Sequence, residues 1–189
     1  MIEMNEEEQY LADQISTWVW SGFYDRAEVH TSLDDVLEGN VDESMLRALI
    51  EEEFQRKTAE EKSWPQFTDC DRLDDVFGDL NGAMIIALQN AGYTTSDGHD
   101  DVGEIHAKQP HGTYKGYCFY HGQDLERAVA GEGLWLAFGD MKDTEAGKTA
   151  IAATIIEALE RHGFSVEWNG NVQTRIRVPK IHWQRRVDR

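Results

Sequence analysis

The sequence predicts an α+β protein in which a helical N-terminal third packs on a mixed sheet of roughly five strands. Up to about residue 62, apolar residues recur every three or four positions, which is the period of an amphipathic helix. After Asn81-Gly82, short apolar runs alternate with helical patterns in the order β-α-β-α-β-α-β-β. We therefore expect a helical region at 1–62 and an α/β domain at 63–189, together forming one compact unit.

The first expected element is an amphipathic helix at about 5–21. Leu11, Ile15 and Val19 recur there at helical spacing, and Gly22 supplies a stop signal. One face of this helix therefore belongs to a hydrophobic core.

Two further helices are expected before the pattern changes. Thr31 and Ser32, followed by two aspartates, form capping-box signals, and a longer apolar stripe predicts a helix at about 42–61. Pro65 then marks a connection, after which a helix is expected over 69–80. The first third is therefore all helix.

The second part of the chain is expected to alternate strands and helices. Apolar runs predict strands at 84–92, 114–120 and 134–139, and helical patterns lie between and after them at 96–109, 124–131 and 143–162. A last pair of strands, 165–168 and 174–178, flanks Asn169-Gly170, a dipeptide typical of hairpins. Because strand-helix-strand units usually form parallel crossovers, we expect the first three strands to run parallel and the last pair antiparallel.

Composition excludes several classes of protein. The 189 residues carry 18 Lys and Arg against 36 Asp and Glu, a formal charge of −18, which disfavours nucleic-acid binding because phosphate affinity comes from cations. No apolar stretch approaches the ~20 residues that cross a bilayer. The acidic start MIEMNEEEQY lacks the pattern of a secretory signal, so we expect a cytoplasmic protein. Two cysteines without zinc spacing predict no disulfide framework, no structural zinc and no cofactor.

Charge is unevenly distributed along the chain. Residues 1–62 carry a net −12 and 63–174 a net −11, whereas 175–189 carry +5. The cations of this basic tail are Arg175, Arg177, Lys180, Arg185, Arg186 and Arg189. Beside so acidic a body, we expect them to fold against it or over Trp183 in preference to forming a nucleic-acid patch.

Polar side chains gather where the three expected parallel strands end. Open α/β sheets bind ligands at this edge. The loops there supply the ligand-binding candidates Asn90, Tyr93, Asp97, His99, His121 and Asp124, with Asp140 from the third loop. The alternative is structural: Asp97 caps one helix, and His121 with Asp124 begins another.

Other arrangements carry weaker signals. Cys118 and His121 suggest a thiolate nucleophile with its base, but side chains three apart on a strand point to opposite faces, so a buried structural Cys118 is favoured. The acids within 69–79 lack the order of an EF-hand, and a solvated helix start is favoured. His99 and His106 lie seven apart, too far for the usual i, i+4 metal pair. No complete catalytic signature occurs.

Three blocks of the sequence resemble a bacterial family of about this length. They are TDCDRLDDVFGDL with ALQNAGYTTSDG (68–98), GYCFYHGQDLERAVAGEGLWLAFG (116–139), and VEWNGNVQTRI with the following Trp183 (166–183). That family is known as a domain of unknown function. The resemblance covers most of 64–183 and implies a shared cytoplasmic α/β domain, with no activity or ligand to carry over.

Two functions follow from these observations. We expect a non-catalytic protein-binding or regulatory module that docks a basic protein through its acidic surface, since the charge is −18 and no catalytic signature is complete. The alternative is a small-molecule or metal-binding enzyme that uses the polar cluster at the strand ends, with His as acid or base. The helical region 1–62 is a candidate for self-association, and no nucleic-acid or membrane partner is expected.

Overall fold

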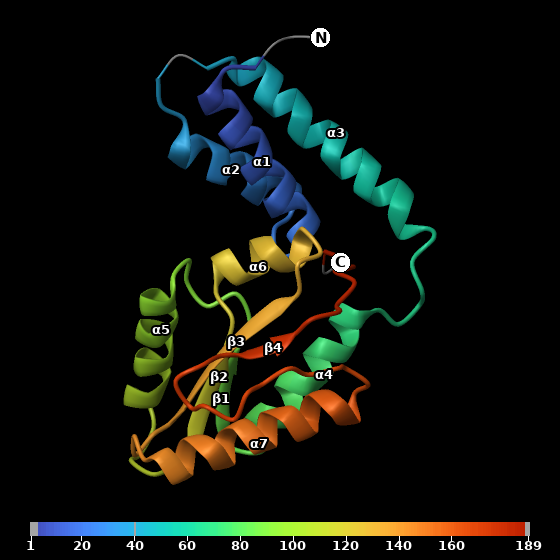
Figure 1. Cartoon of the computed structure of the whole chain (residues 1–189). Coiled ribbons are helices and arrows are strands. Elements are labelled where there is room, and N and C mark those ends of the chain that lie inside the picture. The colour runs from blue at the N-terminus through green and yellow to red at the C-terminus, as the bar shows by residue number, and fades with distance from the viewer. Residues whose placement is uncertain (1–3, 40, 188–189) are drawn as a thin grey trace. The chain divides into compact units, whose positions relative to one another are not determined.

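The chain forms two compact units. A computed structural model describes residues 4–39 and 41–187 (Figure 1). Unit 1 contains the described residues up to Thr68 together with Gln184–Val187, and unit 2 is Asp69–Trp183. The α+β class predicted from the sequence is confirmed.

Unit 1 is helical, as its apolar periodicity predicts. Its helices are α1 (Glu6–Ser21), α2 (Arg26–Val36) and α3 (Glu43–Glu61). Gly22 ends α1 in the left-handed conformation, with φ of +76°, which an L side chain rarely adopts. The capping signals expected at Thr31 and Ser32 are wrong: both residues lie inside α2, whose capping box is formed by Asp25 and Glu28.

The end of the chain completes unit 1. The Arg185 guanidinium lies 4.6 Å from the centre of the Phe23 ring. Arg186 lies 5.7 Å from the Trp64 ring and donates to the carbonyl of Pro65 at 2.9 Å. These two tail cations therefore cover the rings of Phe23 and Trp64, and Arg189 lies outside the described residues.

Unit 2 contains all the strands of the described chain. Its elements, in order, are α4 (Asp69–Gly82), β1 (Ile85–Leu88), α5 (Thr95–Ala107), β2 (Gly116–Phe119), α6 (Gly122–Val129), β3 (Leu134–Asp140), α7 (Glu145–Arg161) and β4 (Ile176–Val178). The described residues form four strands where five were expected. The predicted strand at 165–168 makes only an isolated bridge between Glu167 and Arg177.

The sheet is mixed, but its strand directions differ from the prediction. The strand order is β1-β2-β3-β4, with β1 parallel to β2, and with β3 antiparallel to both β2 and β4. The expected parallel arrangement of the first three strands is therefore wrong. A parallel crossover needs a connection that runs the length of the sheet, and the eight-residue α6 turns the chain back beyond the strand ends instead (Figure 1).

Helices cover both faces of the sheet. Helices α4 and α7 lie side by side, and α5 lies on the other side of the strands (Figure 1). Gly98 of α5 packs so closely on Phe119 that an added Cβ would lie 2.3 Å from its ring. On the opposite face, a Cβ at Gly116 would lie 2.6 Å from Ile151 of α7. No helix within the described ranges is both long enough and apolar enough to cross a membrane.

Candidate functional site

Two of the three loops expected to converge do meet in unit 2. Because β1 and β2 are parallel, their following loops lie at the same sheet edge. The loops are joined by backbone hydrogen bonds from Ala91 N to Tyr120 O at 2.9 Å and from Gly122 N to Gly92 O at 3.0 Å. The third loop lies at the other edge, because β3 runs in the opposite direction.

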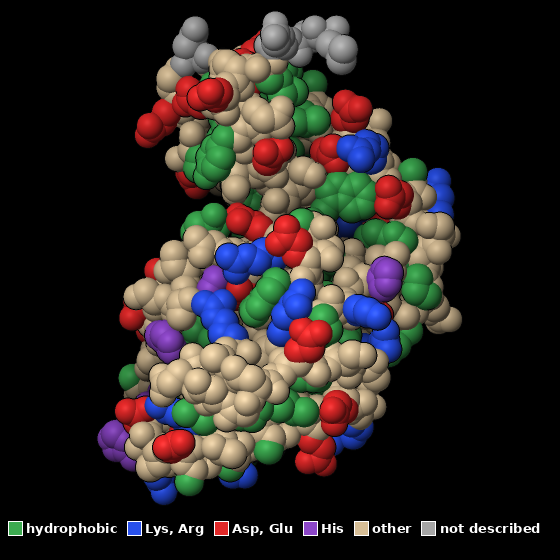
Figure 2. Space-filling model, in the orientation of Figure 1, with side chains coloured by type: hydrophobic (Ala, Val, Ile, Leu, Met, Phe, Trp, Pro, Cys, Tyr) green, Lys and Arg blue, Asp and Glu red, His purple; other side chains and the backbone are tan. Residues whose placement is uncertain are grey.

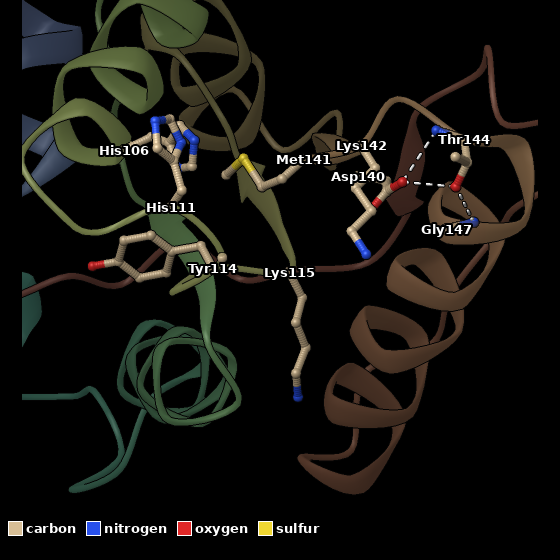
Figure 3. A pocket seen from close by; sticks show the side chains of 10 residues that line it. His106, His111, Tyr114, Lys115, Asp140, Met141, Lys142, Thr144 and Gly147 are labelled. Carbon is tan, nitrogen blue, oxygen red and sulfur yellow. Dashed lines mark hydrogen bonds between the residues drawn. The ribbon is translucent and has the colours of Figure 1, made fainter.

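Asp140 therefore does not join the other candidates. Its carboxylate accepts from the backbone N–H and the hydroxyl of Thr144, at 3.1 and 2.8 Å, and so supports the start of α7. It borders a cavity of 520 Å³ at this opposite edge, where His106, His111 and Tyr114 line the far side (Figure 3). The expectation that this loop shares a site with the other two is wrong.

The two loops that meet also begin two helices. Asp97 accepts from the backbone N–H groups of Tyr93 and Thr94, at 3.1 and 2.8 Å, and completes the capping box of α5. Hydrogen bonds from Thr94 and Tyr93 hold the pKa of the Asp97 carboxyl below its usual range. His121 and Asp124 form the capping box of α6. Helix capping, the alternative to ligand binding, therefore accounts for Asp97 fully. It accounts for only part of the contacts that His121 and Asp124 make.

Asp124 is the centre of a buried charge cluster. Its side chain is completely buried, yet Arg175 Nη1 donates to both of its carboxylate oxygens, at 2.8 and 2.9 Å. Arg127 Nη1 donates to Oδ1 at 3.2 Å. Arg175 Nη2 also donates to the hydroxyl of Thr95 and lies 3.1 Å from Nε2 of His121. The cluster therefore fixes the Arg175 guanidinium against the starts of α5 and α6.

The His121 imidazole favours its neutral form within this cluster. Its Nδ1 lies 3.4 Å from the backbone nitrogen of Asp124, and its Nε2 lies 3.1 Å from Oδ2 of Asp124. Burial lowers the pKa of His121, and the charges of Arg175 and Arg127 lower it further, against the opposing effect of Asp124.

This lowered pKa predicts acid sensitivity. Below the ordinary histidine pKa of about 6.5, the unfolded chain binds a proton that folded His121 does not, so the free energy of unfolding is expected to decrease as the pH falls. Urea unfolding of the protein at pH 7.5 and pH 5.5 measures the loss. A His121→Asn variant keeps a capping side chain that does not titrate, and its loss is expected to be smaller. An equal loss in both proteins would contradict the assignment to His121.

A polar pocket of 240 Å³ lies beside the cluster. Its walls come from α5, β2, β3, α7 and the segment before β4. Its polar lining is Thr95, His99, Tyr117, Lys148, Gln173, Thr174 and Arg175. The His99 ring packs edge-on against Tyr117 and Phe119, with centroids 5.4 and 5.1 Å apart.

Ionisable groups of the polar pocket have shifted pKa values. Burial lowers the pKa of His99 and raises that of the Tyr117 phenol, so both groups favour their neutral forms. A hydrogen bond to Asp143, at 2.5 Å, raises the pKa of Lys148 and keeps it charged. Neutral donors and fixed cations are the side chains that hold a small anion.

The six sequence candidates divide into three roles. His99 lines the polar pocket, and His121 with Asp124 holds Arg175 beside it. Tyr93 is exposed and donates to Glu126 at 3.0 Å, while Asn90 takes a positive φ of +52° in the turn after β1. With the capping role of Asp97, these last three residues shape the loops and do not line the pocket.

Sequence reasoning missed both cations and the phenol of the polar pocket. Tyr117 and Lys148 were not among the ligand-binding candidates, and Arg175 was expected only as one cation of the basic tail. They come from β2, α7 and the segment before β4. Only the basic character of the tail gave a local signal for any of them.

The other candidate constellations form no site. Cys118 is fully buried, and burial raises the pKa of its thiol, so it stays protonated. Asp69 pairs with Arg72, and Asp79 accepts from Arg161 and His162. Among the residues that the structure describes, no group of three or more His, Cys, Asp or Glu side chains could hold a metal ion.

One comparison with known proteins gives a match. A family model described as a domain of unknown function, DUF6891, matches residues 4–187. No curated protein and no solved structure matches the chain. The match spans both units, including the tail segment that completes unit 1.

Proposed function

Because the chain belongs to the DUF6891 family of domains of unknown function, we propose its function from its own residues: unit 2 binds a small oxyanion in the polar pocket. The observation that carries the proposal is the Arg175 guanidinium, which the buried Asp124 carboxylate fixes at the pocket wall. Lys148 supplies a second cation from α7. A carboxylate or a phosphate group complements both cations and the surrounding hydroxyls.

Stability alone does not account for the charge cluster. A buried ion pair loses its hydration, and well-packed apolar residues of similar volume are often as stable or more so. Asp124 is completely buried, whereas the side chain of Arg175 keeps 31% of its surface exposed. The pair thus holds a partly exposed cation in one orientation, which is the preorganisation that anion binding needs.

The direct test is calorimetric titration of the full chain with inorganic phosphate and with acetate. Replacing Lys148 by Met removes one cation from the pocket, and we expect the affinity for the anion that binds to fall about tenfold, or ~1.4 kcal/mol. Lys142→Met is the matched control, because Lys142 lines the cavity at the opposite sheet edge. Equal losses in the two variants, or none in Lys148→Met, would show that the anion does not occupy this pocket.

Docking of a basic protein through the acidic surface stays a second proposal, as does self-association of the helical region. The docking proposal is supported by exposed carboxylates on and between the helices of unit 1: Glu6, Glu7, Asp13, Asp35, Glu38, Glu52 and Glu60. Such a surface steers a basic partner by charge. The polar pocket supports a stronger proposal, because its polar groups converge from several elements on one hollow.

A further inference from the structure

A second hollow of 550 Å³ adjoins the polar pocket. Its walls include two indoles, Trp135 of β3 and Trp168, and the Arg177 side chain. Thr174 and Arg175 line both hollows, so the two spaces are neighbours at the segment before β4. We call the second hollow the tryptophan shelf.

The side chains of the tryptophan shelf are held in place. The Trp168 indole N–H donates to the carbonyl of Thr174 at 3.3 Å, and its ring meets Phe138 edge-on with centroids 5.8 Å apart. The Arg177 guanidinium lies 4.9 Å from the Trp135 ring and pairs with Glu167 at 3.0 Å. Rigid aromatic side chains bind a ligand at a low cost in conformational entropy.

Cations and aromatic rings occur together at this surface. Arg127 lies 5.6 Å from the centre of the Trp135 ring and also pairs with Asp124. Figure 2 shows Lys and Arg side chains gathered around hydrophobic ones over β3 and β4. In a chain of formal charge −18, this local excess of cations favours an anion that also carries an apolar group.

The volumes indicate how a ligand divides between the two hollows. The polar pocket holds 240 Å³, below the ~300–1,000 Å³ typical of sites for small organic molecules, whereas the two spaces together fall within that range. A carboxylate or phosphate group fits the polar pocket. The remainder of an organic ligand then lies along the neighbouring indoles.

We propose that the ligand of the polar pocket is an oxyanion joined to a planar aromatic group, and that this group packs on the tryptophan shelf. The inference rests on the proposed function and adds the class of molecule. The oxyanion meets Arg175 and Lys148, and the planar group contacts Trp168, Trp135 and the Arg177 guanidinium, which also stacks on aromatic rings.

Calorimetric titration of the full chain with matched pairs of anions tests this inference. Phenyl phosphate is compared with methyl phosphate, and benzoate with acetate, so that each pair shares its charge and differs in the planar group. We expect the aromatic member to bind at least about tenfold more tightly in the pair whose head group the pocket accepts. Equal affinities within each pair would overturn the inference and leave anion binding intact, whereas no binding of any anion would overturn both.

Variants of the two indoles locate the aromatic group. In Trp168→Leu and Trp135→Leu, the ratio between the affinities for the aromatic anion and for its aliphatic partner is expected to shrink several-fold. Trp64→Leu is the control, since Trp64 in unit 1 also has an arginine over its ring. An advantage that persists in both shelf variants would overturn the assignment. Because indole variants can lose stability, the Trp168 indole N–H resonance of the unaltered protein is also followed, and it is expected to shift with phenyl phosphate more than with methyl phosphate.

Discussion

The free energy of unfolding of an Asp124→Asn variant is expected to be about 3 kcal/mol lower than that of the unaltered protein. The substitution leaves two guanidinium groups, those of Arg175 and Arg127, without the carboxylate that they share. Removing one partner of a fully buried pair costs ~3–5 kcal/mol, and the partial exposure of both arginines places this cluster at the lower end. Urea unfolding followed by circular dichroism measures the loss.

The same variant also tests whether the cluster serves the polar pocket. Without Asp124 the Arg175 guanidinium loses the contacts to both carboxylate oxygens, so we expect phosphate or acetate affinity to fall as well. Asp101→Asn, an exposed carboxylate of α5, is the control and is expected to change the stability by less than ~0.5 kcal/mol. A loss below ~1 kcal/mol in Asp124→Asn would contradict the structural role given to this carboxylate.

Alanine at two glycines of α5 is expected to change the stability in opposite directions. At Gly98 the new Cβ would lie 2.3 Å from the Phe119 ring, so α5 must shift away from the sheet at a cost of about 2 kcal/mol. At Gly103 the Cβ meets nothing within 4 Å, and alanine in a helix interior is favoured over glycine by ~1 kcal/mol. Thermal or urea unfolding of the two variants therefore gives a stability difference of about 3 kcal/mol.

The Gly98 variant also affects the polar pocket. Thr95 and His99 flank Gly98 on α5 and line the pocket, so a displaced helix moves both side chains. Oxyanion affinity is expected to fall in Gly98→Ala and to stay unchanged in Gly103→Ala. The same stability change in both variants would show that helix propensity, and not the contact with Phe119, decides the outcome.

Local patterns predicted most elements of the fold. The helices α1, α3 and α7 lie within a few residues of their expected positions, because helical periodicity and capping residues act over a few positions. The direction of β3 could not be predicted in this way. Strand direction depends on where the preceding connection crosses the sheet, and the short α6 gave a helical pattern that does not distinguish a crossover from a reversal.

The candidate site was predictable only where it follows the strand ends. His99 and Asp124 lie near the starts of α5 and α6, His121 caps α6, and the parallel pairing of β1 with β2 brings these helix starts together. Arg175 reaches Asp124 across 51 positions of sequence and Thr95 across 80. No spacing motif describes such contacts, because they arise from the pairing of β3 with β4 and not from a local segment.

Unit 1 is built from two segments that are far apart in the sequence, and this has a consequence for the order in which its parts are synthesised. Its last segment, Gln184–Val187, is separated from its helices by the whole of unit 2, so all of that unit must leave the ribosome first. At ~5–20 residues per second, this takes on the order of ten seconds. Throughout that interval, Gly22, Phe23 and Trp64 lack the arginine side chains that later cover them. Until the tail is synthesised, the rings of Phe23 and Trp64 lack this cover, and uncovered aromatic rings are the kind of surface that chaperones bind.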